Sequence, residues 1–269
     1  HSMTDGHYLC FKNVTKSFPG VLALDNVSFD IGQGEIHALM GENGAGKSTL
    51  IKVLTGVYAR DGGEISLNGA PVNMRSPKSA QSAGISTVYQ EVNLIPGLSV
   101  AENIFLGREP LRWGCIDWGT IARRSREALR WLDLDIDVRQ PLASYSIAVQ
   151  QMVAIARALD VKAKVLVLDE PTSSLDVPEV RRLFAAMRKL RSEGLAIIFV
   201  THFLEQAYEI SDRITILRNG AVDEALLQEL GWDVGGCYLN VAVEGAPGPW
   251  ADDLPMAHRV AAHLGIPLV

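Results

Sequence analysis

The sequence has 269 residues, 48% of them hydrophobic, so it can supply the core of one large domain or of two small ones. Its formal net charge of -6 argues against a protein that binds nucleic acid. Its three cysteines, Cys10, Cys115 and Cys237, have neither the spacing of a metal site nor that of a disulfide framework, which fits a reducing cytoplasm.

The first part of the chain is expected to form strands. We interpret residues 1–3, His1-Ser2-Met3, as an expression scar and exclude them. Residues 8–18 alternate between apolar and polar side chains as a strand does, and they end at Phe18 before a Pro-Gly turn. Residues 27–31 and 64–67 are two further expected strands, so an antiparallel β layer should flank the segment between them.

The strongest motif lies between an expected buried strand at 35–40 and an expected helix that starts at Ser48. It matches the phosphate-binding pattern G-x-x-x-x-G-K-[ST] and consists of Gly41, Glu42, Asn43, Gly44, Ala45, Gly46, Lys47, Ser48 and Thr49. Its glycines let the backbone fold into a nest of N–H donors, and the helix N-terminus adds positive potential where phosphates would lie. Lys47 is expected to reach the β- and γ-phosphates of a nucleotide, and the Ser48 hydroxyl to bind Mg²⁺.

The middle of the chain is expected to be helical. Residues 85–90 are a buried strand that ends on the polar Gln90, and from about 91 to 160 the chain changes character. Helices are expected at 100–106, 120–132 and 146–159. In the second of these, apolar side chains share one side, and we interpret the arginines on the rest of its surface as a solvent-exposed face: Arg123, Arg124, Arg126 and Arg130.

The last strands end in polar residues. Residues 165–168 form a continuous apolar strand, typical of a parallel sheet covered on both faces, and they end in Asp169-Glu170. Asp176 is expected to cap the next helix, and a strand at 195–200, far too short to span a membrane, ends in Thr201-His202. This βαβα order predicts an α/β fold with a mostly parallel sheet, whose ligand lies beyond the carboxyl ends of the strands.

Four side chains at these strand ends have the chemistry of nucleotide hydrolysis. Asp169 is placed to hold Mg²⁺, and Glu170 to orient and partly deprotonate an attacking water. Gln90 is a candidate Mg²⁺ ligand or water-positioning group, and His202 a candidate contact to the γ-phosphate. Gln90 or His202 alone is more simply a structural residue, but their joint occurrence at matched strand ends favours a functional role.

In order and spacing, residues 8–222 resemble the ATP-binding-cassette (ABC) ATPases. The matching features are the Walker A loop at 41–49, the loop at Gln90, the Walker B run at 165–170, the D-loop Ser173-Ser174-Leu175-Asp176, the switch residue His202, and Phe18 as the aromatic that stacks on adenine. The resemblance implies a P-loop NTPase with a RecA-like, mostly parallel core, a flanking antiparallel β subdomain and an inserted helical subdomain at about 91–160. It also implies an ABC nucleotide-binding domain over residues 4–222, which pairs with a second such domain to sandwich two ATP molecules.

The resemblance is closer still to the ATPase subunits of bacterial monosaccharide importers, in the ribose, galactose and galactofuranose group. The stretches that carry it are residues 40–50, 88–91, 104–109 and 150–159, and residues 201–208 look most like the galactofuranose-type branch. In this group one polypeptide usually carries two cassettes, and this chain is similar to the first. The resemblance implies ATP and Mg²⁺ as cofactors, membrane permease subunits as partners, a periplasmic sugar-binding protein as an indirect partner, and a peripheral position on the cytoplasmic face of the cell membrane.

Two departures from the family matter. The signature that completes the partner's ATP site is usually Leu-Ser-Gly-Gly-Gln, whereas this chain has Tyr145-Ser146-Ile147-Ala148-Val149. Only Ser146 is kept, so efficient hydrolysis of the ATP that this motif and Asp176 would complete is in doubt. Residues 223–269 resemble neither the family's short helix nor a second cassette, and we treat them as a C-terminal tail of unclear nature.

Three alternatives stay open at this point. The degenerate signature is compatible with an ATP-binding regulatory module that hydrolyses weakly. A soluble cassette ATPase that acts on ribosomes or DNA is a second alternative, although the net acidity argues against it. A small-molecule kinase with a phosphate loop is the third, and it gives no role to Asp176 or His202.

Overall fold

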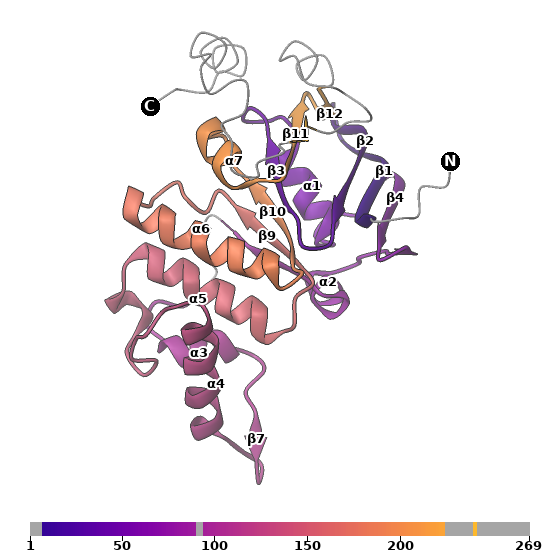
Figure 1. Ribbon diagram of the computed structural model, residues 1–269. Coiled ribbons are helices and arrows are strands. Elements are labelled where there is room, and N and C mark those ends of the chain that lie inside the picture. Colours follow the sequence, from indigo (N-terminus) through magenta and orange to yellow (C-terminus); the bar gives the residue numbers. More distant parts are fainter. Residues whose placement is uncertain (1–6, 90–93, 224–238, 241–269) are drawn as a thin grey trace.

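The computed structural model describes residues 7–89, 94–223 and 239–240, which form two large sheets, one two-stranded hairpin and a set of covering helices (Figure 1). Gln90 and most of the tail lie outside the described residues. In chain order the elements are β1 (His7–Phe18), β2 (Val21–Gly32), β3 (Ile36–Met40), α1 (Lys47–Leu54), β4 (Gly62–Leu67), β5 (Ala70–Pro71), α2 (Pro77–Ala83), β6 (Ile85–Val88), α3 (Val100–Phe105), β7 (Leu111–Arg112), β8 (Cys115–Ile116), α4 (Trp118–Trp131), the 3₁₀ turn η1 (Leu142–Ser144), α5 (Ile147–Asp160), β9 (Val165–Asp169), α6 (Val177–Ser192), β10 (Ala196–Val200), α7 (Leu204–Ile210), β11 (Arg213–Arg218), β12 (Ala221–Val222) and β13 (Leu239–Asn240).

The smaller sheet is antiparallel, with the strand order β2-β1-β4-β5. Its inner face is apolar, because apolar and polar residues alternate along these strands and every second side chain points to the same face. Phe11 of β1 and Phe29 of β2 stack there with ring centroids 4.5 Å apart. The predicted antiparallel β layer beside the phosphate loop is confirmed.

The larger sheet has the order β12-β11-β3-β10-β9-β6, and its five strands from β11 to β6 run parallel. Its central strands are buried on both faces. Leu166 and Leu168 of β9 belong to the core formed with α5 and α6, whereas Val165 and Val167 belong to the core formed with α1 and the antiparallel sheet. The run at 165–168 is therefore continuously apolar because β9 is covered on both faces, as the sequence predicts. The predicted mostly parallel α/β fold is confirmed.

The helices α3, α4 and α5 pack against one another on the side of the molecule away from α1, and the β7–β8 hairpin lies beyond them (Figure 1). The α4 arginines are exposed as expected at 123, 126 and 130, whereas the side chain of Arg124 is 42% exposed and also makes contacts within the protein. Its guanidinium lies 4.9 Å from the centroid of the Phe105 ring and donates to Asp160 at 2.5 Å. Asp160 also accepts from Arg108 at 3.1 Å, so Arg124 helps to tie α4 to the end of α5.

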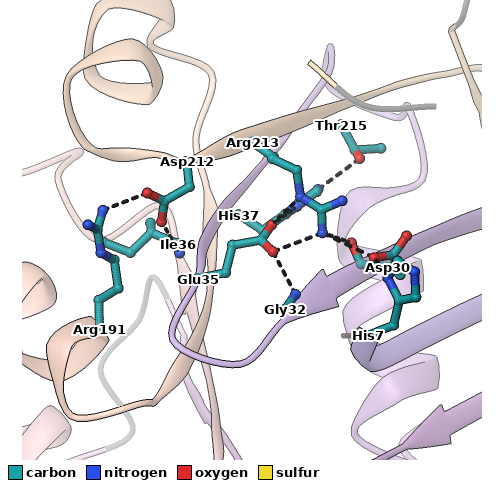
Figure 2. Close-up of polar contacts among 10 residues, drawn as sticks. All are labelled: His7, Asp30, Gly32, Glu35, Ile36, His37, Arg191, Asp212, Arg213 and Thr215. Atoms are coloured by element: carbon teal, nitrogen blue, oxygen red, sulfur yellow. Dashed lines mark hydrogen bonds and ion pairs between the residues drawn. The ribbon is translucent and has the colours of Figure 1, made fainter. Parts of the chain in front are cut away.

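A polar network joins the two sheets (Figure 2). It lies at the amino ends of β3 and β11, whereas the phosphate loop follows the carboxyl end of β3. Arg213, the first residue of β11, donates to both oxygens of Glu35 at 2.8 Å and to Asp30 of β2 at 3.1 Å. The buried ring of His37 contacts Glu35 through Nδ1 at 2.9 Å and Thr215 through Nε2 at 2.8 Å. Burial lowers the pKa of His37, while the hydrogen bond and the charge of Glu35 act to raise it.

Within the described part of the chain, every helix is too short or too polar to span a membrane.

Candidate functional site

The loop between β3 and α1 is closely packed against neighbouring strands, and at two of its glycines there is no room for a side chain. Gly41 has φ 145°, and a Cβ atom there would lie 2.3 Å from the carbonyl oxygen of Leu217. Gly46, the N-cap of α1, has φ 106°, and a Cβ atom there would lie 2.8 Å from the carbonyl oxygen of Ala23. The loop is therefore packed between the beginning of β2 and the end of β11, where only glycine fits.

Lys47 is the first residue of α1, and its ammonium group lies inside the curve of the loop. Only 6% of the residue is exposed, and Nζ donates to the carbonyl oxygens of Gly41 at 2.6 Å and of Glu42 at 3.0 Å. Burial lowers the pKa of Lys47, while the nearby carboxylates of Glu170 and Asp169 act to raise it. A buried cation whose partners are mainly neutral carbonyls is well placed to accept an anionic ligand.

A cavity of about 350 Å³ lies over this loop. Its lining comes from the loop and α1, the beginning of β2, and the ends of β9 and β11: Val21, Leu22, Ala23, Asn43, Gly44, Gly46, Lys47, Ser48, Thr49, Glu170 and Asn219. The structure thus brings Glu170 to the phosphate loop, as the strand-end argument expects. The apolar Val21 and Leu22, which are 61% and 50% exposed, were not expected here from the sequence, because only the fold brings β2 to the loop.

Glu170 has a strained backbone and a partner in His202. It follows β9 with φ 46°, a left-handed conformation that non-glycine residues rarely adopt and that is common at functional sites. Its N–H donates to the carbonyl of Val200 at 3.0 Å, and its carboxylate oxygen lies 3.3 Å from Nδ1 of His202. The side chains of Glu170 and His202 are only 18% and 32% exposed. The carboxyl ends of β9 and β10 therefore present a matched acid–imidazole pair beside the cavity.

Asp169 lies one residue earlier, at the end of β9. Burial raises its pKa, and the neighbouring Glu170 raises it further, against the attraction of Lys47. Among the described residues, no group of three or more His, Cys, Asp or Glu side chains is arranged to hold a metal ion. The expectation from the sequence that the Ser48 hydroxyl and the Asp169 carboxylate hold a cation stays a prediction.

Phe18 lies at the end of β1, half-buried, and outside the lining of the loop cavity as far as the described residues go. The ring of Tyr58 meets it edge-on with centroids 5.2 Å apart, and the ammonium group of Lys16 lies 5.3 Å from the Phe18 ring centroid. No pattern in the sequence pairs Tyr58 with Phe18, because they are 40 positions apart.

The signature and D-loop residues are at helix N-termini. Ser146 caps α5 by accepting from the N–H of Val149 at 3.4 Å, Ile147 is 49% exposed, and Ala148 is half-buried. Asp176 caps α6 by accepting from the N–H of Glu179 at 2.8 Å. Within the described part of the chain, none of these residues lines the cavity over the phosphate loop. These residues therefore lie at the surface, away from the phosphate loop of the same chain.

Comparison with known sequences shows which proteins the chain is similar to. A family model described as ABC transporter matches residues 24–173. The galactofuranose transporter ATP-binding protein YtfR of Escherichia coli (strain K12) is 56% identical over 220 residues, which cover 81% of this chain and 44% of that protein. The ribose import ATP-binding protein RbsA 1 of Rubrobacter xylanophilus is 50% identical, over 82% of this chain and 44% of that protein. The fructose import ATP-binding protein FruK of Bifidobacterium longum is 56% identical, over 81% and 43%. The chain thus spans less than half the length of these relatives.

Solved structures share the fold. cbiO1 from Clostridium perfringens, described as part of an ABC transporter complex, has a TM-score of 0.72 at 27% identity and covers 81% of this chain and 88% of its own. The dimeric post-hydrolysis state of the ATP-binding cassette MJ0796, bound to ADP and Pi, has a TM-score of 0.69 at 28% identity and covers 80% and 97%. The predicted P-loop cassette fold is confirmed by this likeness.

Proposed function

The chain belongs to the ABC transporter family, and from this premise we propose that it binds and hydrolyses ATP to power the import of a monosaccharide through separate membrane permease subunits. The observation that carries the proposal is the shared cavity, in which the phosphate loop and the strained Glu170 face the same space. A carboxylate next to a phosphate loop can orient and partly deprotonate an attacking water, which is what hydrolysis requires.

The loop residues would bind the phosphates of ATP. Backbone N–H groups at the start of α1 offer hydrogen bonds and positive potential, and Lys47 would exchange its two carbonyl partners for the β- and γ-phosphates. Phosphate oxygens are the stronger acceptors, because the hydrogen bond is then charged on both sides. At the other end of the nucleotide, Phe18 would stack on adenine, with Tyr58 packed edge-on behind it.

Ser48 and Asp169 fit a Mg²⁺ ion. Mg²⁺ prefers oxygen ligands and is usually bound by one or two protein groups together with substrate phosphates. Ser48 supplies a hydroxyl in the lining of the cavity, and Asp169 supplies a carboxylate at the end of β9, one residue before Glu170, which also lines the cavity. When bound, Mg²⁺ would neutralise part of the charge on the phosphates. Gln90 as a further Mg²⁺ ligand or water-positioning residue lies outside the described residues and stays a prediction.

Glu170 and His202 would act together on the water and the γ-phosphate. The 3.3 Å contact between Nδ1 of His202 and the Glu170 carboxylate holds both side chains at the cavity edge. In our proposal Glu170 receives the hydrogen bond of the attacking water, and His202 contacts the γ-phosphate. Because the backbone of Glu170 is already strained, its orientation does not have to be created when ATP binds.

A second cassette would complete the site. Ser146, Ile147 and Ala148 at the start of α5, and Asp176 at the start of α6, are the groups that we propose face the ATP held by a partner cassette. Their place at helix N-termini, apart from this chain's own cavity, supports a role in trans. The dimeric MJ0796 cassette, 28% identical to this chain, supports the same arrangement.

A groove beside the site would seat the permease. It has a volume of about 340 Å³, lies between α2, β6 and α5, and includes the basic side chains Lys78 and Arg157 and the apolar Leu94 and Ala154. We propose that an acidic, partly apolar segment of a permease subunit occupies it, which would place the chain on the cytoplasmic face of the membrane, with a periplasmic sugar-binding protein as an indirect partner. Because the relatives carry the names of galactofuranose, ribose and fructose importers, we assign the cargo only as a monosaccharide.

The second candidate is an ATP-binding regulatory module with weak hydrolysis. The observation that favours it is the signature, where Ile147 and Ala148 stand in place of the family's glycines and Ile147 is 49% exposed. A soluble cassette ATPase without a transport role is less well supported, because the relatives described above are named as transporter or import proteins.

The Glu170→Gln variant tests the proposal. We expect ATP turnover to fall by at least about 100-fold, because the carboxylate that activates water is lost while the phosphate contacts remain. Binding of Mg²⁺-ATP should be kept, and light scattering should detect a dimer that forms only with ATP. If wild-type turnover in the presence of Mg²⁺ is no faster than that of Glu170→Gln, although both proteins bind ATP, the regulatory module is the correct function.

A further inference from the structure

The β7–β8 hairpin projects from the end of the helical region that lies farthest from the phosphate loop (Figure 1). Its strands are only two residues long, and Arg112 pairs with Cys115 across the turn. Trp113 and Gly114 form that turn with φ 56° and 83°, the positive values of a type I′ hairpin turn. The backbone of the turn thus holds Trp113 at the tip, where its side chain is 93% exposed.

Apolar exposure is concentrated at this hairpin. The large hydrophobic side chains exposed there are Leu111 at 68%, Trp113 at 93%, Ile116 at 40% and Trp118, the first residue of α4, at 53%. These are four of the ten large hydrophobic residues that are exposed in the described part of the chain, and they lie within eight consecutive positions. An exposed cluster of this kind usually marks an interaction surface.

The same segment is basic, although the chain as a whole is acidic. Residues 108–131 have a net charge of +3, whereas the whole chain has -6. Arg108 and Arg124 pair with Asp160, Arg123 with Glu127, and Arg130 with Asp135. Among the described ion pairs, Arg112 and Arg126 have no carboxylate partner, and they are the cations of the segment that remain for an outside anion. Asp117 is occupied as the N-cap of α4, where it accepts from the N–H and hydroxyl of Thr120. Arg112, on the hairpin itself, is exposed beside Trp113. The chemical complement of this tip is therefore an anionic surface with an apolar layer beneath it.

We propose that the hairpin, together with Trp118, is an interfacial anchor that inserts shallowly into an anionic lipid surface. Tryptophan suits the headgroup region because its large ring is apolar while its N–H remains polar. Binding there increases with the apolar area buried and with the attraction of basic residues to anionic lipids. The tip projects as a hairpin with a single two-residue turn (Figure 1), a shape that suits shallow insertion rather than the enclosure of a partner segment.

The position of the hairpin agrees with a membrane surface. Its base is tied to α5, because Arg108 donates to Asp160 at 3.1 Å. Ala154, Arg157 and Ala158 of the same helix line the groove that we assign to a permease segment. This agreement in position rests on the proposed function. Binding of the anchor to lipid requires neither ATP nor a permease, so an experiment can contradict the anchor without contradicting the proposed function, and the reverse.

Flotation of the full chain with vesicles tests the anchor. One set of vesicles contains phosphatidylcholine with about one third phosphatidylglycerol, and the other contains phosphatidylcholine alone. We expect binding to the anionic vesicles, weakened by salt, and about 10-fold weaker binding by the double variant Trp113→Ser, Trp118→Ser. Arg112→Gln should weaken binding by a smaller factor. Val57→Ser, which removes an apolar side chain that is 46% exposed elsewhere, and Arg75→Gln, an exposed arginine outside the segment, should bind as the wild type does.

Two further measurements exclude other occupants. Lipids brominated near the headgroup should quench wild-type tryptophan fluorescence more strongly than that of the double variant, whose fold is checked by circular dichroism. The proposal is overturned if the wild type does not float with anionic vesicles, or if the double variant floats equally well. It is also overturned if light scattering without lipid shows self-association that Trp113→Ser abolishes, or if binding occurs only to vesicles that contain a permease.

Discussion

At the scale of single residues, the signature separates the two candidate functions. Ile147 and Ala148 occupy the first turn of α5, where N–H groups would approach the phosphate of an ATP held by a partner cassette. Two glycines there would let the backbone approach closely, because they have no Cβ atom. In our proposal, the exposed Ile147 side chain would keep that phosphate away from these donors or force it to shift.

We therefore expect the double variant Ile147→Gly, Ala148→Gly to raise ATP turnover by roughly 10-fold, since each donor aimed at developing charge contributes strongly to rate. The measurement is steady-state release of phosphate at saturating Mg²⁺-ATP. The matched control is Ile95→Gly, which removes another exposed apolar side chain outside this turn. Unchanged or lower turnover by the double variant would mean that the side chains in this signature do not limit hydrolysis.

At the scale of elements, capping boxes determine where several helices begin. Ser99 caps α3 by accepting from the N–H of Glu102 at 3.2 Å, and the Glu102 carboxylate accepts from the N–H of Ser99 at 2.8 Å. The helix has only six residues, so much of its stability must come from this cap and from the buried Val100, Ile104 and Phe105.

Replacement of Ser99 by alanine is expected to lower the free energy of unfolding by about 1 kcal/mol, because one N–H at the start of α3 loses its acceptor. Urea denaturation followed by circular dichroism measures the change. Ser82→Ala, at an exposed position of α2, should change stability much less. Equal losses in the two variants would contradict a specific role for the cap.

Patterns of neighbouring residues predicted most of the elements, and the elements that were missed have sequences too polar or too short to show such a pattern. The strands β1, β3, β9 and β10 follow from their apolar patterns, and α6 follows from its cap and its apolar stripe. α2 was not expected, because its sequence from Pro77 to Ala83 is small and polar and has no apolar period. The β7–β8 hairpin was missed because two-residue strands are too short to show an alternation.

For the candidate site, the limit of prediction is contact between residues that are distant in the sequence. Glu170 and the phosphate loop could be placed together because both follow parallel strands, whose carboxyl ends meet at one edge of the sheet. Val21 and Leu22 could not, since they approach the loop from the other sheet. Asp30 and Arg213 are 183 positions apart, and only the finished fold shows that they pair.

At the scale of the whole molecule, the network in Figure 2 connects the two sheets. Glu35 lies between them, with Arg213 of the parallel sheet on one side and the N–H of Gly32, at the end of β2, donating to it at 2.6 Å. Burial alone would raise the pKa of Glu35, but hydrogen bonds from His37 and Arg213, together with their charge interactions, outweigh it and lower the pKa to about 2. The folded protein therefore favours the ionised form of Glu35.

This shift makes stability depend on pH in a definite direction. Because the folded pKa of about 2 lies below the ordinary value of 4.5, the unfolded chain binds more protons between these values. The contribution of Glu35 is thus fully present above about pH 4.5 and is lost as the pH falls toward 2. A shift of this size corresponds to about 3 kcal/mol at neutral pH, of which about 2 kcal/mol would be lost by pH 3.

The Glu35→Gln variant tests this linkage, since glutamine keeps the shape of the side chain but cannot be ionised. At pH 7 it should unfold at a lower urea concentration than the wild type, because Arg213 loses its main ion-pair partner. As the pH falls from 7 to 3, the difference in the free energy of unfolding should narrow by about 2 kcal/mol. Glu64→Gln, at an exposed position of β4, should follow the wild-type curve. A difference between Glu35→Gln and the wild type that stays constant down to pH 3 would show that Glu35 supports the junction of the sheets through its shape and hydrogen bonds, and not through its charge.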